Sequence, residues 1–376
     1  MREMKDSGIP WIGKIPEGWN CARMKQVGKY VNGYAFKPET WSEKGLPIIR
    51  IQNLNNVNAA FNYYEGELPE KYIVNKGDLL ISWSASLGAY YWEGDVAYLN
   101  QHIFKVVFDK SDIIKGFLKY AVEAKLEEMK RKVHGATMQH IVKKDFDNTI
   151  IPVPPLSIQR SIVAELDLLH SVISKKKEQL RELDNLAQSL FYQMFGDPIT
   201  NPMGWEIKKL GEVAENCDYM RKPITASDRI PGNIPYYGAS GIVDYVRDYI
   251  FDGDYLLVSE DGANLLARST PIAFSISGKN WVNNHAHVLK FRESYTQLYV
   301  QTLINLIDIS DIVTGAVQPK LNQAQLNKFP LPLPPLSLQQ SFAAKVSAIE
   351  AQKQAITQSI QHTEALLAQR MDNYFG

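Results

Sequence analysis

The sequence predicts an α+β protein in which two similar α+β domains alternate with two long helices. Three observations predict this: a proline-rich stretch that occurs twice, a long heptad pattern after each copy, and short β-rich runs in the remaining segments. The expected domains cover residues 1–150 and 197–330. The expected proline arms, each with its helix, cover residues 151–196 and 331–376.

The repeat is the clearest feature of the chain. Residues 151–161 read I-P-V-P-P-L-S-I-Q-R-S, and residues 331–341 read L-P-L-P-P-L-S-L-Q-Q-S. Weaker echoes occur upstream, since G-D-L-L-I-S ending at Ser82 resembles D-Y-L-L-V-S ending at Ser259, and L-N-Q-H ending at His102 resembles V-N-N-H ending at His285. Similarity in two copies of this size indicates paired domains of one fold rather than a solenoid.

Each repeat predicts an extended arm followed by a helix. Proline removes a backbone donor and fixes φ, so the P-x-P-P-L stretch is not a helix interior, and Ser157 and Ser337 are the expected N-caps. Apolar residues then recur at spacings of four and three, the pattern of a coiled-coil seam, over a helix of about 38 residues and about 57 Å. The predicted seam consists of Leu166, Leu169, Ile173, Leu180, Leu183, Leu190, Val346, Ile349, Ile356, Ile360 and Leu367.

Because a stripe this narrow needs a partner, we expect the two helices to pair with each other. Polar residues on the seam, such as Lys176 and Lys353, are expected to fix the register of the pair. The other segments carry short runs of β-branched and aromatic residues between Gly, Asn, Asp and Pro, which is typical of strands joined by irregular loops. A helical piece is expected in each, near residues 111–132 and 294–309.

Composition sets limits on function. The chain has 41 basic and 41 acidic residues, so net charge gives no reason to expect nucleic acid or a membrane; DNA binding would need basic residues gathered on one face. The two cysteines exclude a disulfide framework and a Cys-rich zinc module, and fit a reducing cytosol. A polar start and the lack of any apolar run near 18 residues predict a cytoplasmic protein without a membrane span.

The sequence offers no catalytic signature. G-I-P-W-I-G-K, from Gly8 to Lys14, matches most of a phosphate-binding loop, but Ile15 stands where Ser or Thr must meet Mg²⁺. His285 and His287 share a strand face, yet no third metal ligand suggests itself, so we expect hydrogen-bonding histidines and no metal site. Triad, amino-methylation and nuclease motifs are also missing, which predicts a chain without catalytic residues.

The chain resembles the DNA specificity subunit (HsdS) of type I restriction–modification systems. In the first half the resemblance is carried by D-S-G-I-P-W-I-G-K-I-P-E-G-W (Asp6 to Trp19) and by the doubled P-x-P-P-L-S-x-Q. In the second half it is carried by P-Y-Y-G-A-S-G (Pro235 to Gly241), D-G-A-N (Asp261 to Asn264), W-V-N-N-H-A-H-V (Trp281 to Val288) and G-A-V-Q-P-K-L (Gly315 to Leu321). Together these motifs cover nearly the whole chain.

The resemblance implies the following. Each α+β segment is a target recognition domain that reads one half of a bipartite site in double-stranded DNA. The helices pair as an antiparallel coiled coil with pseudo-twofold symmetry, set the spacing and dock two methyltransferase (M) subunits, which methylate adenine with S-adenosylmethionine. Restriction (R) subunits use ATP and Mg²⁺ to translocate and cleave DNA, a bacterial defence against foreign DNA. The chain itself needs no cofactor.

Candidate DNA contacts are polar or aromatic residues on loops beside the expected strands. Gln and Asn suit adenine, and Arg and Lys suit guanine. In the first half the candidates are Arg50, Gln52, Asn53, Ser82, Ser84, Ser86, Thr137, Gln139 and His140. In the second half they are Tyr219, Arg221, Lys222, Tyr236, Tyr237, Ser240, Asn264, Arg268, Gln318 and Lys320. Each is alternatively part of a turn or a solvated loop, and His102 and His285 are alternatively hydrogen-bonding residues of the domain cores.

Three other functions fit parts of the sequence. A specificity subunit of a defence methylase outside type I would share every feature, and only the identity of its partner protein would distinguish it from a type I subunit. A nuclease with a degenerate core would cleave DNA with a divalent metal, although its carboxylates are missing. A coiled-coil adaptor without DNA contact would not need two large domains. The neutral charge is explained if M subunits supply much of the phosphate contact.

Overall fold

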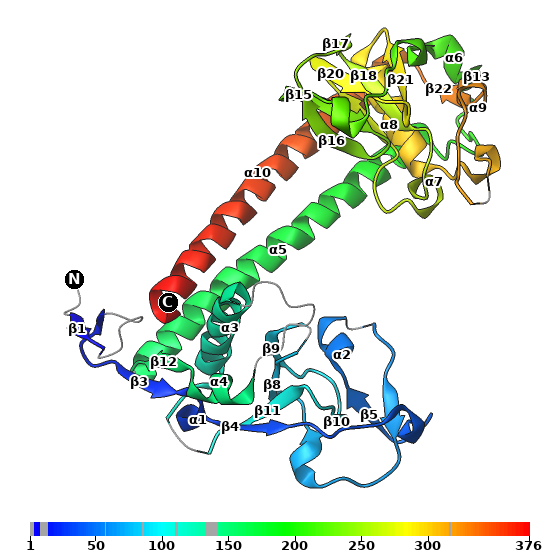
Figure 1. Ribbon diagram of the computed structural model, residues 1–376. Coiled ribbons are helices and arrows are strands. Elements are labelled where there is room, and N and C mark those ends of the chain that lie inside the picture. Colours follow the sequence, from blue (N-terminus) through cyan, green and yellow to red (C-terminus); the bar gives the residue numbers. More distant parts are fainter. Residues whose placement is uncertain are drawn as a thin grey trace. The chain divides into compact units, whose positions relative to one another are not determined.

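The computed structural model describes residues 4–7, 14–56, 58–84, 86–109, 112–132, 142–315 and 317–376. The chain forms two compact units. Unit 1 consists of Met1–Lys175 and Ser359–Gly376, and unit 2 consists of Lys176–Gln358. Each unit therefore takes a share of both long helices (Figure 1). The four-part division at residues 150, 196 and 330 stays a prediction.

Unit 1 contains two four-stranded sheets. The first has the order β4-β11-β8-β9 and is antiparallel, with strands Lys29–Asn32, Ile103–Val107, Leu79–Ser82 and Gly88–Tyr91. The second has the order β6-β5-β10-β7, with strands Asn62–Tyr64, Leu46–Ile49, Ala97–Leu99 and Ile73–Val74, and its β5 and β10 run parallel.

Unit 2 repeats this plan strand for strand. Its antiparallel sheet has the order β14-β21-β18-β19, with strands Ala214–Asn216, Ala286–Phe291, Tyr255–Ser259 and Ala273–Ile276. Its second sheet has the order β16-β15-β20-β17, with strands Gly241–Val246, Pro231–Gly238, Lys279–Val282 and Phe251–Asp252, and β15 and β20 are parallel. The predicted pair of similar α+β domains is confirmed.

The proline arms are short strands, as predicted. Strand β12 (Ile150–Val153) pairs with β3 (Asn20–Arg23), and β22 (Pro330–Leu333) pairs with β13 (Glu206–Lys209). In a two-stranded sheet both strands are edges, where a proline without an N–H is tolerated. A further pair joins β1 (Met4–Asp6) to β2 (Lys14–Pro16).

One medium-length helix packs in each unit close to where it was predicted. Helix α3 spans Lys115–Lys132 and α8 spans Ser294–Leu306. The short helices are α1 (Met24–Val27), α2 (Ile51–Asn55), α4 (Lys143–Asn148), α6 (Leu210–Val213), α7 (Asn264–Ala267) and α9 (Gln323–Asn327). The 3₁₀ turns span Pro38–Thr40, Glu70–Tyr72, Asp218–Met220, Ala226–Asp228 and Ser310–Ile312. In each unit the antiparallel sheet, this helix and part of the long helix pair share one apolar core.

The long helices are α5 (Leu156–Phe195) and α10 (Leu336–Phe375). Both begin one residue before the serine expected to cap them, so the N-cap prediction for Ser157 and Ser337 is wrong. The amides of Ile158 and Gln159 donate to the carbonyl of Pro155, which therefore occupies the N-cap position. The extended backbone that proline adopts suits that position, where φ and ψ are not yet helical.

Helices α5 and α10 pair antiparallel within each unit. In unit 1, Glu165 accepts a hydrogen bond from Tyr374 at 2.6 Å. In unit 2, Asp184 pairs with Lys353 at 2.7 Å, while Phe191 lies against Phe342 with ring centroids 5.8 Å apart. In unit 2 the partner's number on α10 falls as the number on α5 rises, which confirms the predicted direction. All eleven predicted seam residues are buried or half-buried.

Among the residues that the structure describes, none of the helices combines the length and apolar composition needed to span a bilayer.

Candidate nucleic-acid interface

Five charged residues of unit 2 meet at one end of the antiparallel sheet. Asp218 and Arg221 follow β14, Glu260 follows β18, His287 lies on β21, and Lys320 comes from the loop before α9. Strand β21 lies between β14 and β18, so the segments that leave these two neighbours flank His287. We call these five residues the His287 network.

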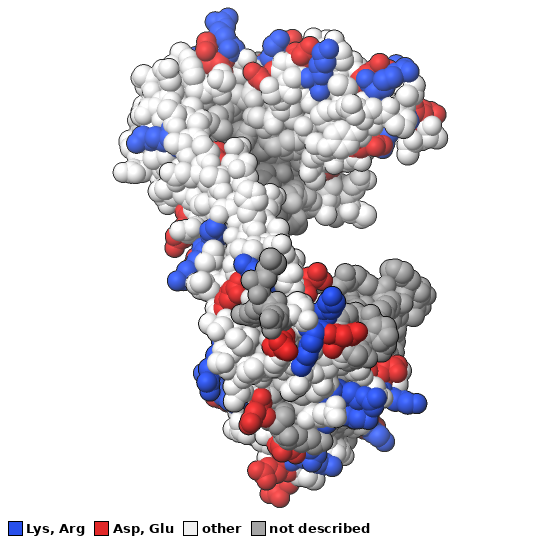
Figure 2. Space-filling view, turned by 90° about the vertical axis from the view of Figure 1, so that its left-hand side faces the viewer, with Lys and Arg blue, Asp and Glu red and all other residues white. Residues whose placement is uncertain are grey.

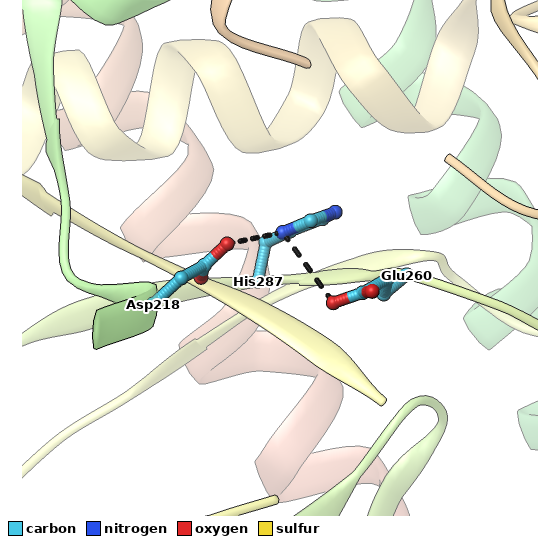
Figure 3. Close-up of side chains that lie close together, drawn as sticks. All are labelled: Asp218, Glu260 and His287. Atoms are coloured by element: carbon cyan, nitrogen blue, oxygen red, sulfur yellow. Dashed lines mark hydrogen bonds and ion pairs between the residues drawn. The ribbon is translucent and has the colours of Figure 1, made fainter. Parts of the chain in front are cut away.

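His287 is held as an imidazolium. Its Nδ1 lies 2.6 Å from Oδ2 of Asp218 (Figure 3). Its Nε2 lies 2.8 Å from the carbonyl oxygen of Leu321. A carbonyl only accepts, so Nε2 carries a proton, and an ionised carboxylate only accepts, so Nδ1 carries one too. The His287 side chain is 1% exposed. A buried charge of this kind requires the neighbouring carboxylates.

Arg221 and Lys320 complete the charge balance. Arg221 pairs with Glu260 at 2.6 Å and with Asp218 at 3.3 Å, and it donates to the carbonyl of Ala286 at 2.8 Å. Lys320 pairs with Glu260 at 3.1 Å. Burial opposes ionisation of Asp218 and Glu260. Hydrogen bonds from His287 to Asp218 and from Arg221 to Glu260, with the nearby positive charges, still lower the pKa of both carboxyls.

The cluster has the spacing of a metal site but not its chemistry. The ligand atoms of Asp218, Glu260 and His287 lie within 4.8 Å of one another. A metal needs a deprotonated imidazole nitrogen and unpaired carboxylate oxygens, whereas here the Nδ1 lone pair is protonated and Arg221 and Lys320 pair with the acids. We interpret the cluster as an ion network that organises structure.

Both histidines hydrogen-bond, as predicted from the sequence. His285 is half-exposed, so it is no core residue, and its Nδ1 lies 2.8 Å from Oδ2 of Asp261. Sequence reasoning missed Asp218 and Glu260, because no local spacing announces residues that only the sheet order brings to His287.

Unit 1 fills the equivalent positions differently. Ser82 pairs with Ile103 as Ser259 pairs with Ala286, so Trp83 and Phe104 correspond to Glu260 and His287. In unit 1, Asn32 on β4 pairs with Phe104 on β11. In unit 2, Asn216 on β14 pairs with Leu289 on β21, so continuing this register by two residues places Asp218 opposite His287. Asn32 therefore corresponds to Asp218. The Trp83 indole donates to Asn32 at 3.3 Å and stacks on Phe104 at 5.7 Å. Unit 1 thus has packed aromatic side chains at the positions where unit 2 has paired charged side chains.

Exposed side chains border the His287 network. Tyr219, beside Asp218, is 75% exposed, and Val317, in the loop that Lys320 closes, is 100% exposed. Gln318 is exposed in the same loop. Ser240 is also exposed, and the preceding carbonyl, of Ala239, accepts a 2.5 Å hydrogen bond from Ser259. The segments 218–222, 239–241 and 317–320 therefore lie beside the network and offer side chains to a ligand.

A family model described as the type I restriction modification DNA specificity domain matches residues 16–185 and 202–364. The chain belongs to this family. The resemblance predicted from the motifs is confirmed, and the two matched segments cover most of both halves. The class of protein is therefore a DNA specificity component rather than a catalytic one.

The similar proteins carry related names. A putative type I restriction enzyme specificity subunit of Haemophilus influenzae is 37% identical over 146 residues, 39% of this chain and 37% of that protein. The EcoBI specificity subunit of Escherichia coli is 26% identical over 55% of this chain and 44% of its own length. The MjaVIII specificity subunit of Methanocaldococcus jannaschii is 23% identical over 90% of this chain and 87% of its own length. The chain thus spans under half the length of the first two relatives.

Solved structures share the fold. The type I restriction–modification S subunit of M. genitalium has a TM-score of 0.55 at 14% identity and covers 95% of this chain and 96% of its own. A chain from a structure of type I restriction–modification complex assembly and conformational transition has a TM-score of 0.58 at 18% identity, covering 96% and 98%. The α+β architecture with long helices is therefore one seen before in S subunits.

Several candidates of this specificity chain serve their own domain. Tyr236 is 1% exposed, and its hydroxyl accepts from the Ile224 amide at 3.0 Å. Tyr237 is half-buried against Phe274. Asn264 binds the backbone of Thr270, and Arg268 donates to the carbonyls of Ile304 and Ile307, at the C-terminal end of α8. These side chains support the fold, while Lys222 is exposed beside Arg221.

In unit 1 the candidates also divide by exposure. Asn53 is buried and accepts from the Arg50 amide at 3.0 Å, and the Arg50 guanidinium donates to Asn62 at 2.9 Å. Ser82 and Ser84 are buried. Gln52 and Ser86 are exposed. Thr137, Gln139 and His140 lie outside the described residues, as do residues 8–13 of the loop-like motif.

Surface charge agrees with the zero net charge of the chain. On the face that Figure 2 shows, basic and acidic side chains are interspersed over both units. On that face the scattered cations are available to phosphates, but they form no single field that would attract DNA from a distance.

Proposed function

We propose that the chain is the specificity subunit of a type I restriction–modification complex and that each domain reads one half of a bipartite DNA site. Residues 1–150 and 197–330 would be the two target recognition domains. The observation that carries the proposal is the double match to a DNA specificity domain on two units of the same strand order. DNA has local twofold symmetry in its backbone, so two similar readers related by a pseudo-twofold axis can dock on two half-sites in equivalent ways.

The long helices would set the spacing of the half-sites. Each has 40 residues, and 40 residues at 1.5 Å per residue measure about 60 Å. One turn of DNA is about 34–36 Å. Paired antiparallel, the helices would act as a spacer with a fixed length and would also offer the surface on which two M subunits dock.

Sequence reading would depend on the exposed candidates. In unit 2 these are Tyr219, Lys222, Ser240, Gln318 and Lys320. In unit 1 they are Gln52 and Ser86, together with Thr137, Gln139 and His140 outside the described residues. Gln suits adenine and Lys suits guanine in the major groove, while Ser and Tyr also bind phosphates.

The chemistry would belong to the partners. M subunits would bring S-adenosylmethionine, and R subunits would bring ATP and Mg²⁺. Since electrostatic contacts supply most non-specific affinity and this chain is neutral, the isolated chain would bind DNA weakly and the complex tightly. Two cysteines outside any disulfide suit the reducing cytoplasm, where the complex would act.

The test is a methylation map of the source genome with this gene intact and deleted. We expect an adenine-methylated motif in two parts, with a fixed gap, to disappear on deletion. A pull-down with the chain as bait shows whether M subunits are present. An unchanged map in cells where M subunits bind the chain and methylate DNA would overturn the proposal.

A further inference from the structure

The His287 network ties two exposed loops of unit 2 to one buried charge. His287 donates to the Leu321 carbonyl through Nε2 and to Asp218 through Nδ1. Leu321 directly follows residues 317–320, which include Gln318, and Asp218 begins the turn that carries Tyr219. A single imidazolium therefore fixes the end of one loop and the start of another.

Backbone and ion-pair contacts extend the same arrangement. The Leu321 amide donates to the Glu260 carbonyl at 2.8 Å, and the Gly262 amide donates to the Pro319 carbonyl at 3.0 Å. Lys320 pairs with one oxygen of Glu260 and Arg221 with the other. The loop and the turn are thus joined through Glu260 as well as through His287.

The charged groups that face His287 come from each neighbouring segment. Asp218 and Arg221 come from the turn after β14, Glu260 comes from the segment after β18, and Lys320 comes from the loop before α9. The two acids need positive partners, and an uncharged residue at position 287 leaves them with Arg221 and Lys320 alone. Loss of the imidazolium therefore loosens both loops without removing any exposed side chain.

The equivalent positions of unit 1 hold no ion network. Trp83 and Phe104 stack there, and Asn32 accepts a hydrogen bond from the Trp83 indole. The two units share a fold but hold the corresponding segments by different means. A change at His287 is consequently a change to one unit only.

We propose that His287 is a positioning residue for sequence discrimination by unit 2, holding the segments that carry Tyr219 and Gln318 in the geometry that reads one half-site. The inference rests on the proposed function. His287 is buried and does not contact DNA. It acts through the backbone of the two loops, so its loss lowers discrimination between bases rather than uniform affinity for phosphates.

The experiment uses the purified complex with M subunits and S-adenosylmethionine. Methylation rates are measured on duplexes carrying the mapped motif and on duplexes with one base pair changed in either half. Wild type, His287→Phe and the matched control His285→Asn are compared. The control removes an imidazole two residues away that pairs with Asp261 and lies outside the network.

A wrong base pair in a well-read position typically reduces binding about 5- to 150-fold. We expect His287→Phe to reduce discrimination about tenfold or more at one half-site, to leave the other half-site unchanged, and to leave the salt dependence of binding unchanged. His285→Asn should retain discrimination at both. Equal losses at both half-sites, or no loss at either, would overturn the inference.

Two further measurements keep the outcomes separable. If His287→Phe does not fold, His287→Gln replaces it, because a neutral amide with one nitrogen cannot hold both Asp218 and the Leu321 carbonyl as the two ring nitrogens do; the same loss at one half-site is expected, and unchanged discrimination contradicts the inference. Wild-type complex that discriminates at neither half-site would refute the proposed function itself, whereas normal wild-type discrimination with an unaffected variant would refute only the role of His287.

Discussion

Asp218 and Glu260 make the stability of unit 2 depend on acid. The folded state lowers the pKa of both carboxyls, because hydrogen bonds and positive neighbours outweigh the burial that opposes their ionisation. A lowered pKa gives stability that is present above the unfolded value of about 4 and is lost as pH falls through the folded value. Unit 2 should therefore weaken below about pH 4.

Asp218→Asn tests this dependence. The amide cannot ionise, so the variant should lose about 2 kcal/mol at neutral pH, as expected when a buried charged group loses its partner, and its stability should fall less steeply in acid. Urea denaturation at several pH values, followed by tryptophan fluorescence, measures both effects. An acid dependence identical to that of wild type would contradict the role given to Asp218.

The contacts and exposure of single side chains were the features least predictable from the sequence. Asn264, Arg268 and Tyr236 are candidate DNA contacts by residue type and by their place near turns, and in the structure each of them hydrogen-bonds within its own unit. Residue type does not reveal which face of a loop is exposed. The full exposure of Val317 could not be predicted either, since an apolar residue type gives no sign of it.

At the scale of elements, a buried glutamine occupies the equivalent position near the start of each long helix. Gln159 and Gln339 are both buried, and each donates from Nε2 to a proline carbonyl, at 2.9 Å to Pro154 and at 2.7 Å to Pro334. Gln159 also accepts from the Ile114 amide at 2.9 Å. Among the described residues Oε1 of Gln339 has no hydrogen-bond partner.

Gln159→Leu should consequently destabilise the protein by about 1–2 kcal/mol more than Gln339→Leu, because only the first leaves a half-buried amide, that of Ile114, without its acceptor. Chemical denaturation of both variants measures the difference, and faster hydrogen exchange at Ile114 in Gln159→Leu would locate it. Equal costs would show that the Ile114 contact adds nothing.

The helix pair also carries a polar residue on its seam. Lys353 is half-buried, and it bonds Asp184 on the other helix at 2.7 Å and Glu350 at 2.9 Å. Burial disfavours its charge, but the two carboxylates more than compensate and raise its pKa. Lys353 is thus a charged seam residue with partners on both helices, as a register-fixing residue would be.

Lys353→Glu would bring a third carboxylate between Asp184 and Glu350. We expect a loss of about 1–2 kcal/mol from like-charge repulsion and the lost pairs, measured by urea denaturation with circular dichroism. Lys345→Glu, on the exposed side of the same helix, should change stability by less than about 0.5 kcal/mol. Similar losses for the two variants would argue against Lys353 as a register-fixing residue.

Elements were the most predictable level. Heptad spacing is local, so both long helices could be predicted from the sequence, although Phe191, which packs against Phe342 on the other helix, was not among the predicted seam residues. The caps could not, because Pro155 takes the N-cap position through its backbone alone, and a side-chain rule points to Ser157 instead. Sheet order was also hidden: β10 pairs parallel with β5, and no local pattern encodes which strands become neighbours.

For the whole molecule, the spacer proposal makes a quantitative prediction. Inserting one heptad into each long helix keeps the seam in phase and lengthens the pair by about 10 Å at 1.5 Å per residue. At 3.4 Å per base pair this is about three base pairs. The methylated motif should keep both half-sites and gain about three base pairs of gap.

Insertion into one helix alone is the control, since it displaces the seam of that helix against its partner and should abolish methylation. A methylation map of cells that carry each variant measures the outcome. An unchanged gap in the double insertion would show that the helices do not set the spacing.

The duplicated plan of the molecule could be predicted from the sequence because residues 151–161 and 331–341 are identical at seven of eleven positions. The contact of Asp218 with His287 was not, because 69 residues separate them. The family match then supplied what neither pattern could, namely that the paired domains are DNA specificity domains.

The division of the helices between the units also has a consequence for biosynthesis. Unit 2 consists of one continuous segment, whereas unit 1 needs Ser359–Gly376, which the ribosome makes after the whole of unit 2. Phe375 is fully buried in unit 1 against Phe117, with ring centroids 5.2 Å apart. Residues 1–175 therefore lack part of their apolar core until Ser359–Gly376 has been made, because Phe375 belongs to that core. Unit 2 should therefore complete its fold before unit 1 does, and holdase chaperones should bind unit 1 in the meantime.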